Sequence, residues 1–314
     1  MTGGLGALVV AIYGRRWALL DKPNERSSHE KVTPRGGGIG ILAALVLCSV
    51  LYSVPVYFWG PALLVSLISF WGDRFEVRVV IRLAAQFFLA LCFLWFAVTS
   101  QAGYASIPAV IALTFFYLVY IVGTANYYNF MDGINGIAGI TGLVAFGLLG
   151  VYGSEAGKVP VLSTLSFSMM AACAGFLPFN VPKARVFMGD VGSVLLGFVF
   201  GGLVVMMSVT VGEFILLASF LFPFYADELI TLWERIRDGD RLTMAHRRHL
   251  YQVLANEAGV PHWRVSVGYG LVQLMVGVVI WQVCDIDLYW GVGLLVLFFV
   301  IFVLFNNKIK CRYA

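Results

Sequence analysis

Long apolar runs separated by short polar loops dominate the sequence. A helix needs about 20 mostly apolar residues to cross a bilayer, and eleven segments approach that length. The predicted spans are residues 3–20, 37–54, 56–72, 80–99, 106–124, 134–152, 159–178, 192–210, 213–230, 264–284 and 288–306. The third span is short and the breaks near Pro55 and Val211 are indistinct, so ten spans is the alternative. The pattern predicts an all-α, polytopic integral membrane helical bundle with 10–11 transmembrane helices.

The basic residues are distributed unevenly between the two sets of loops. Of the 21 Lys and Arg residues, 20 fall in the loops on one side of the predicted bundle, and Lys158 alone falls on the other. The positive-inside rule makes the crowded side cytoplasmic. The N-terminus is therefore predicted to lie outside and the C-terminus in the cytoplasm.

The composition agrees with a chain that is solvated by lipid. Hydrophobic residues make up 60% and charged residues 12%, against about 45–50% and 25% in soluble domains. No polar stretch is long enough for a soluble domain, so we expect a single transmembrane domain over residues 1–314. The net charge of +4 gives little support to nucleic-acid binding, and no nucleic-acid partner is expected. The five cysteines lack metal-ligand spacing and are predicted to be reduced.

Five polar loops are predicted to share the cytoplasmic face, where they would form the active site. They cover residues 21–36, 73–82, 125–135, 179–192 and 231–264. A carboxylate beside hydrocarbon is costly without a partner, so ionisable residues there indicate a functional site. The loops place these polar side chains on one face: Asp73, Asn126, Asn129, Asp132, Asp190, His246 and His249.

The residue types in these loops favour phosphate chemistry at a metal ion. Asp and Asn oxygens suit Mg²⁺, which binds through one or two carboxylates together with substrate phosphates. Asn126, Asn129 and Asp132 recur every third residue and can share one helix face. The chain has no Walker-type glycine loop, no G-x-S-x-G elbow and no Cys/His zinc spacing.

Some of these polar residues also have simpler explanations. For Asp73 the alternative is an interfacial residue at the end of a span. Asp227 and Glu228 are expected to cap the ninth span or to pair with Arg235. The remaining alternatives are ordinary loop charges at Asp21 and Arg26, a turn at Asn24, a solvated surface at His246 and His249, and turn residues at Asp238 and Asp240 around Gly239.

Taken together, the five loops resemble those of the polyprenyl-phosphate N-acetylhexosamine-1-phosphate transferases, which belong to glycosyltransferase family 4. The resemblance runs from about Asp21 to Val265 and preserves the family's motif order. The D-x-P-N-x-R-S-S-H opening, PRGGG and the HRRHLYQ ending are most similar to the branch that initiates O-antigen-type glycans. The resemblance implies a multi-pass protein of the bacterial inner (cytoplasmic) membrane, with its active site facing the cytoplasm.

The resemblance also implies roles for individual residues. Asn129 and Asp190 would hold Mg²⁺, with Mn²⁺ as the alternative, against the diphosphate of a UDP-sugar. Arg82 would bind the lipid phosphate. The catalytic candidates are Asp73, Asp132 and Asp190. The nucleotide-sugar candidates are Asn126, Asn135, Phe187, His246, Arg247, Arg248 and His249, of which Asn135 would bind uracil and Phe187 would stack on it. Weaker candidates are Asn24, Arg26 and His29.

One position departs from the family pattern. The family usually has two adjacent aspartates where this chain reads Gly72-Asp73, and the first has been proposed as the base that deprotonates the lipid phosphate. Three interpretations stay open: the base is dispensable because the phosphate is already a dianion near pH 7, Asp73 suffices, or the protein is impaired. We favour the first.

The reaction implied by the resemblance is transfer of N-acetylhexosamine 1-phosphate from a UDP-sugar to undecaprenyl phosphate, with release of UMP. The polyprenyl-diphosphate sugar would initiate O-antigen or another cell-envelope polysaccharide. UDP-GlcNAc is the leading donor, and UDP-FucNAc and UDP-QuiNAc are alternatives. A homodimer is left open. The rival classes are a transporter, disfavoured because the charged residues lie at span ends rather than at mid-membrane, and a family member that binds lipid phosphate without catalysis.

Overall fold

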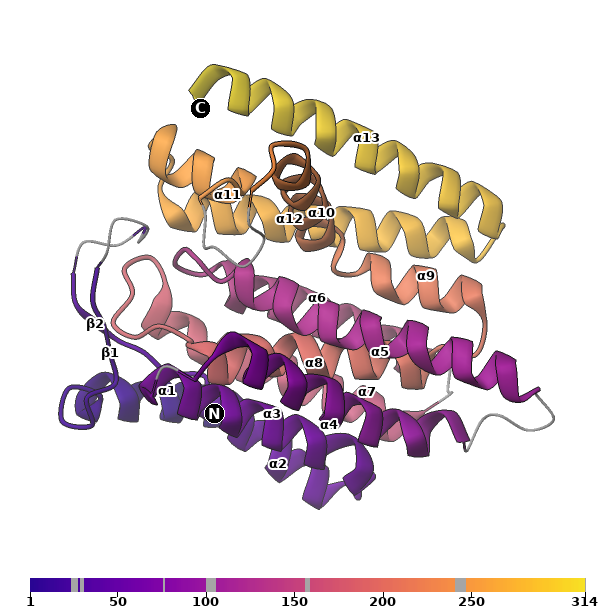
Figure 1. Ribbon diagram of the computed structural model, residues 1–314, viewed down its shortest axis with the longest axis horizontal. Coiled ribbons are helices and arrows are strands. Elements are labelled where there is room, and N and C mark those ends of the chain that lie inside the picture. The colour runs from indigo at the N-terminus through magenta and orange to yellow at the C-terminus, as the bar shows by residue number, and fades with distance from the viewer. Residues whose placement is uncertain are drawn as a thin grey trace.

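The computed structural model describes residues 1–23, 28, 31–75, 77–99, 106–155, 159–240 and 247–313, which form a helical bundle (Figure 1). Its helices are α1 (Thr2–Tyr13), α2 (Ile39–Leu51), α3 (Val56–Phe75), α4 (Val79–Thr99), α5 (Ile107–Phe130), α6 (Ile137–Glu155), α7 (Pro160–Asn180), α8 (Asp190–Met207), α9 (Val211–Ser219), α10 (Phe222–Arg237), α11 (Leu250–Gln252), the π-helical turn η1 (Val253–Glu257), α12 (His262–Cys284) and α13 (Leu288–Tyr313). Two short strands, β1 (Leu20–Asp21) and β2 (Thr33–Pro34), pair antiparallel. The predicted all-α membrane bundle is confirmed.

Each of the eleven predicted apolar segments contains a helix, although the helices differ in length. Seven described helices are long and apolar enough to cross a membrane: α4, α5, α6, α7, α8, α12 and α13. At the predicted ninth span, α9 and α10 form a pair bent by 87°, which would make an eighth crossing. Helices α1 and α2 have 12 and 13 residues, or about 18–20 Å at 1.5 Å per residue. They are shorter than the predicted spans at 3–20 and 37–54.

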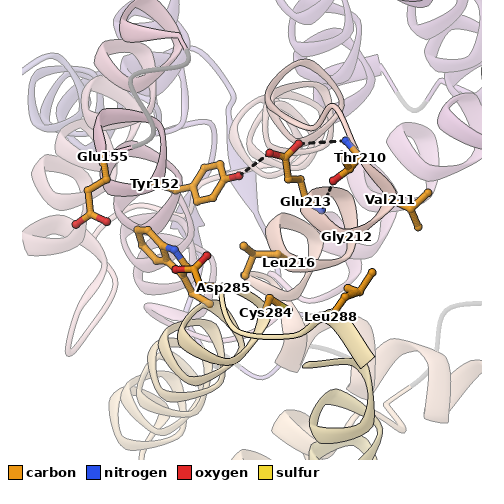
Figure 2. A pocket seen from close by; sticks show the side chains of 11 residues that line it. Tyr152, Glu155, Thr210, Val211, Gly212, Glu213, Leu216, Cys284, Asp285 and Leu288 are labelled. Carbon is orange, nitrogen blue, oxygen red and sulfur yellow. Dashed lines mark hydrogen bonds between the residues drawn. The ribbon is translucent and has the colours of Figure 1, made fainter. Parts of the chain in front are cut away.

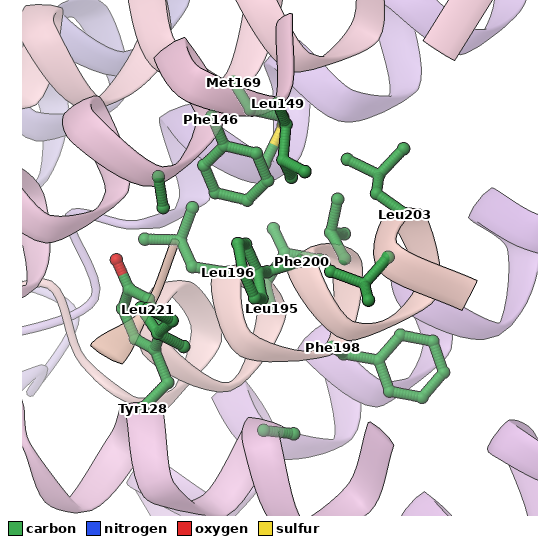
Figure 3. Close-up of a cluster of buried hydrophobic side chains, with 14 of the residues drawn as sticks. Tyr128, Phe146, Leu149, Met169, Leu195, Leu196, Phe198, Phe200, Leu203 and Leu221 are labelled. Carbon is green, nitrogen blue, oxygen red and sulfur yellow. The ribbon is translucent and has the colours of Figure 1, made fainter. Parts of the chain in front are cut away.

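Helix α8 is the central helix of the bundle. Of its 18 residues, 16 are buried, as expected for a helix that is apolar on all sides. Phe198 and Phe200 are fully buried, and the Phe200 ring packs edge-on against Phe146 of α6 (Figure 3). In helix α13, only 6% of the most apolar stretch is buried. Most of its side chains therefore face the surroundings of the bundle.

Glycines allow helices to approach closely where the bundle is tightest. A Cβ atom added to Gly38, at the start of α2, would collide with Gly192 of α8, and one added to Gly197 of α8 would lie 2.6 Å from the Thr124 carbonyl oxygen of α5. Small residues of this kind hold membrane helices together, because lipid supplies no hydrophobic force between them. The contacts bring the N-terminal half of α8 against the elements that contain the polar loops.

The break between α9 and α10 is stabilised by a buried glutamine. The Gln273 side-chain amide of α12 donates to the Phe220 carbonyl oxygen at 2.7 Å and to the Thr141 carbonyl oxygen at 3.2 Å. A carbonyl group released from a helix inside a membrane needs such a partner, since no water is available. After the bend, α10 is seen nearly end-on in Figure 1 and therefore runs across the direction of the long helices.

Candidate active site

A polar cavity of about 240 Å³ lies where the polar loops meet, and each of the five predicted loops contributes to its wall. Six of the predicted site residues line it: Asp73, Asn129, Asp132, Asn135, Phe187 and Asp190. The lining also includes six polar residues that the sequence analysis did not single out as site residues: Asp21, Ser28, Arg35, Asn180, Gln252 and His262. Residues that are far apart in the sequence, between Asp21 and His262, therefore meet at this cavity.

Asp73 and Asp190 are joined directly. Asp190 is the first residue of α8, and its backbone N–H donates to the Asp73 carboxylate at 3.0 Å. Gly189, which precedes it, has φ of +74°, and a Cβ there would lie 2.9 Å from the Gly36 nitrogen. A positive φ favours glycine, so the Gly-Asp sequence is explained by the backbone as well as by the carboxylate.

Two arginines neutralise this pair of carboxylates. Arg82 Nη1 lies 2.5 Å from Asp190 Oδ2. Arg35 Nη1 lies 3.5 Å from Asp73 Oδ1, and its Nη2 also donates to the Asp73 carbonyl oxygen. The two arginine side chains are about 30% exposed; Arg35 lines the cavity, whereas Arg82 reaches it only through its bond to Asp190. Two arginines beside a polar cavity suit an anionic ligand.

The PRGGG segment is positioned by the fourth loop. Gly36 and Gly37 donate backbone hydrogen bonds to the Phe187 carbonyl oxygen at 3.1 and 2.9 Å, and the Phe187 N–H donates to the Pro34 carbonyl oxygen at 2.8 Å. This pairing places Arg35 beside Phe187. The sequence contained a signal for Arg35, namely its place in PRGGG. Its spacing from Asp73 did not predict that the two side chains would form an ion pair.

The two asparagines of the N-x-x-N-x-x-D motif have different surroundings. The Asn129 side-chain oxygen accepts a hydrogen bond from Ser193 Oγ at 2.6 Å, and its side chain is within hydrogen-bonding reach of the Asp190 carboxylate. Asn126 instead donates to Gln86 Oε1 of α4 at 2.6 Å and to the Val122 carbonyl oxygen. The structure therefore brings Asn129 into the cavity and leaves Asn126 as a contact between α4 and α5.

The donor set fits a magnesium ion that is held together with a phosphate ligand. In the described part of the chain, no three His, Cys, Asp or Glu side chains form a ready cage for a metal. Burial raises the pKa of Asp132 well above its usual value, and the carboxylates of Asp190 and Asp73 raise it further. A divalent cation would relieve this repulsion, and Mg²⁺ commonly takes only one or two protein carboxylates. Asn129 and Asp190 would provide one amide oxygen and one carboxylate for it.

The opposite wall of the cavity is held by Asn180 and His262. Asn180 accepts from the Gly136 N–H at 2.6 Å and donates to the Val186 carbonyl oxygen at 2.9 Å, so it ties the third loop to the fourth. Asn135 donates from its side chain to the Pro182 carbonyl oxygen, and its backbone N–H lies 3.4 Å from His262 Nδ1. No motif in the sequence indicated His262.

In the HRRHLYQ segment, Gln252 lines the cavity, whereas Arg248 and His249 do not. The His249 ring is 2% exposed and faces Asp227 and Glu228, at 3.7 and 3.4 Å. Arg248 pairs with Asp238 and Asp240 at 2.7 and 3.3 Å. Arg247, which is partly buried, is not among the residues that line the cavity. Four candidates lie outside the described residues: Asn24, Arg26, His29 and His246.

A larger cavity, of about 700 Å³, lies at the opposite end of the bundle (Figure 2). Its wall includes Glu155, Glu213 and Asp285, with Tyr152 donating to Glu213 at 3.4 Å. None of its described lining residues is basic, whereas phosphate recognition needs positive charge or oriented N–H groups. Volume alone therefore does not identify the active site, and the smaller cavity has the required chemistry.

Similarity to known proteins agrees with this geometry. The profile of glycosyl transferase family 4 matches residues 55–208, a range that contains Asp73, Arg82, Asn129 and Asp190. Over these 154 of its 314 residues the chain is similar to this family. The resemblance inferred from the sequence motifs is thus confirmed, and membership of the O-antigen-initiating branch stays a prediction.

Individual relatives share the family assignment. The undecaprenyl-phosphate alpha-N-acetylglucosaminyl 1-phosphate transferase of Thermotoga maritima is 30% identical over 197 residues, which cover 60% of this chain and 57% of that protein. The decaprenyl-phosphate N-acetylglucosaminephosphotransferase of Mycobacterium leprae is 28% identical over 312 residues, covering 86% and 77%. A probable undecaprenyl-phosphate N-acetylglucosaminyl 1-phosphate transferase of Bacillus subtilis is 27% identical over 196 residues, covering 57% and 52%. The chain thus matches little more than half the length of two of these relatives.

Proposed function

We propose that this protein transfers N-acetylhexosamine 1-phosphate, with GlcNAc 1-phosphate as the first choice, from a UDP-sugar to undecaprenyl phosphate. An oxygen of the lipid phosphate attacks the sugar-bearing phosphorus, the phosphoanhydride bond to UMP breaks, and UMP leaves. The observation that supports this most is the meeting of Asp73, Asn129 and Asp190 at one polar cavity, with Arg82 paired to Asp190. The relatives' names support the polyprenyl acceptor and the GlcNAc 1-phosphate group.

Asn129 and Asp190 would hold Mg²⁺, or Mn²⁺ in its place. When bound, the ion would neutralise charge on the donor diphosphate. The chain's own contribution is positional. Asp73 fixes the start of α8 through the Asp190 N–H, and Ser193 orients the Asn129 amide. Such preorganisation of charge and geometry is the main source of catalysis in phosphoryl transfer.

Arg82 is placed to bind the lipid phosphate. Its guanidinium lies beside Asp190 and its side chain is 29% exposed, so it can exchange this carboxylate for an incoming phosphate oxygen. Asp73 is already engaged by Arg35 and by the Asp190 N–H, which favours a positioning role over service as a base. A phosphate monoester has a second pKa near 6 and needs no base at pH 7.

The donor would occupy the side of the cavity formed by Asn135 and Phe187, with uracil at these two residues. Four other candidates do not line the cavity, so we assign them supporting roles: Asn126, Arg247, Arg248 and His249. An apolar groove of about 440 Å³ at the α9–α10 bend, lined in part by Phe222 and Phe299, has the chemistry to hold an isoprenoid tail.

We further propose that the site faces the cytoplasm of a bacterial inner membrane and that the product initiates O-antigen or another cell-envelope polysaccharide. The unequal distribution of Lys and Arg supports the sidedness. The motifs at the two ends of the resemblance support the pathway.

The test is transfer by purified, detergent-solubilised protein. UDP-GlcNAc, labelled in the sugar, is incubated with undecaprenyl phosphate in Mg²⁺ or in excess chelator, and UMP release and label in the lipid fraction are measured. We expect both products in Mg²⁺ and neither in chelator. Asp190→Asn should abolish transfer, and Asp285→Asn, in the other cavity, is the matched control. Binding of lipid phosphate without UMP release from any UDP-N-acetylhexosamine would instead support a non-catalytic lipid-binding protein.

A further inference from the structure

We propose that the buried carboxylate of Asp227 is a positioning residue of the transferase, which fixes Tyr251 and Gln252 against the loop that contains Asp132. The inference rests on the proposed function and extends it to a residue for which the sequence suggested only a cap for the ninth span or a pair with Arg235. Asp227 lies in α10 and does not line the cavity.

Asp227 binds a distant segment of the chain rather than capping its own helix. Its side chain is 0% exposed. Its Oδ1 accepts from the Leu250 N–H at 2.9 Å, and its Oδ2 accepts from the Tyr251 N–H at 3.3 Å and from the Tyr269 hydroxyl of α12 at 2.6 Å. One carboxylate thus joins α10, α11 and α12. An isolated buried charge is costly, so these donors are required for it to remain in place.

Tyr251 connects this carboxylate to the motif loop. Its ring is fully buried, and its hydroxyl donates to the Phe130 carbonyl oxygen at 3.0 Å. A Cβ atom on Gly133 would collide with the same hydroxyl. Tyr251 therefore contacts the backbone on both sides of Asp132 and limits where that carboxylate can lie.

Gln252 gives the segment direct access to the cavity. It lines the cavity, and its side-chain oxygen accepts from the His249 N–H at 3.3 Å. This bond holds Gln252 close to the backbone that Asp227 fixes. Displacement of residues 250–252 would therefore have two effects at once. It would move Gln252 in the cavity wall, and it would loosen the loop of Asp132, which Tyr251 contacts.

The alternative is that Asp227 only stabilises the fold. The two roles differ in what a small perturbation at Tyr251 does. Tyr251→Phe removes a single hydroxyl and keeps the ring in the core, and Tyr152→Phe, which removes the hydroxyl that donates to Glu213 at the other end of the bundle, is the matched control. Asp227→Asn keeps the shape of the side chain but replaces one acceptor oxygen by a donor that faces donors.

The experiment measures kcat, KM for both substrates and thermal unfolding of Asp227→Asn, Tyr251→Phe, their double variant and Tyr152→Phe. We expect kcat to fall about tenfold in each of the first two, with KM for the lipid changed less than twofold. In the double variant kcat should also fall about tenfold rather than a hundredfold, because the effects of substituting two coupled residues are not additive. Tyr152→Phe should retain wild-type kcat. Additive losses, or a wild-type kcat for Tyr251→Phe, would overturn the proposal.

Hydrogen exchange provides a test that does not need turnover. In Asp227→Asn, amides of residues 130–136 should exchange faster, together with those of residues 250–252. Faster exchange confined to residues 227–231 and 250–252 would refute the link. If the wild-type protein transferred no sugar phosphate but the exchange result held, the proposed function would fail while the connection to the motif loop stood. If the wild-type protein were active but the exchange result failed, only this inference would be lost.

Discussion

Restoring the family's first aspartate at Gly72 tests whether a base is needed. Gly72 lies in the last turn of α3, and a Cβ atom added there would lie 3.1 Å from Arg82 Cδ and 3.9 Å from Val77 Cβ. The flexible Arg82 side chain can shift by the few tenths of an ångström that this requires. The new carboxylate of Gly72→Asp would then point along Arg82, toward the guanidinium that now pairs with Asp190.

The expected effect of Gly72→Asp on the rate is small, because two modest energetic costs oppose any gain from a new base. Competition for a partly exposed guanidinium is worth roughly 1 kcal/mol or less. Repulsion from a neighbouring carboxylate about 5 Å away in a wet site is also about 0.8 kcal/mol. The nucleophile is already largely a dianion near pH 7, so removal of a proton contributes little. We therefore expect Gly72→Asp to change kcat less than about tenfold, or about 1.4 kcal/mol.

The assay is the initial rate of lipid-linked product formation by purified protein between pH 6 and 9. Gly72→Asn has nearly the same volume without the charge and is the matched control. The wild-type rate should rise as the pH passes about 6, where the phosphate dianion forms, and then level off. A hundredfold gain in Gly72→Asp that Gly72→Asn lacks would show that a base matters and that direct attack by the dianion is wrong.

Three further predictions follow from the site and the fold. Asp190→Asn should lower transfer at least about a hundredfold, or about 2.7 kcal/mol, with normal membrane insertion; near-normal turnover in saturating Mg²⁺ would contradict the metal assignment. In a cysteine-free background, a membrane-impermeant maleimide should label Lys158→Cys in intact cells and Lys183→Cys only after permeabilisation, and the reverse pattern would overturn the sidedness. Gly192→Ala should lower the unfolding temperature in detergent, because its Cβ would press on α2 at a cost of about 1–3 kcal/mol; Gly268→Ala, with open space around it, should not, and equal effects would refute the packing argument.

The sequence by itself determined the class of fold and indicated six of the fifteen residues that line the cavity. Apolar run length is a local property, so the helices could be predicted from it, although α1 and α2 proved shorter than their apolar segments. Asp73, Asp132 and Asp190 could be predicted because a charge at the end of an apolar span needs a partner, and Asn129 because its spacing places it on the helix face of Asp132.

Only the tertiary structure decided which polar side chains enter the cavity. Asn126 and Asn129 share one helix, yet Gln86 of the neighbouring α4 turns Asn126 away from the cavity. His249 is buried against Asp227 because the α9–α10 pair bends by 87°, a bend that depends on helix packing and on Gln273.

Tertiary contacts also explain why the spacing of residues in the sequence did not indicate some of the residues that line the cavity. Arg35, Asn180 and His262 reach the cavity through backbone and side-chain bonds to loops distant in the sequence. Periodicity predicts which residues share a helix face. It does not predict which loop that face meets, since this depends on contacts between segments far apart in the chain.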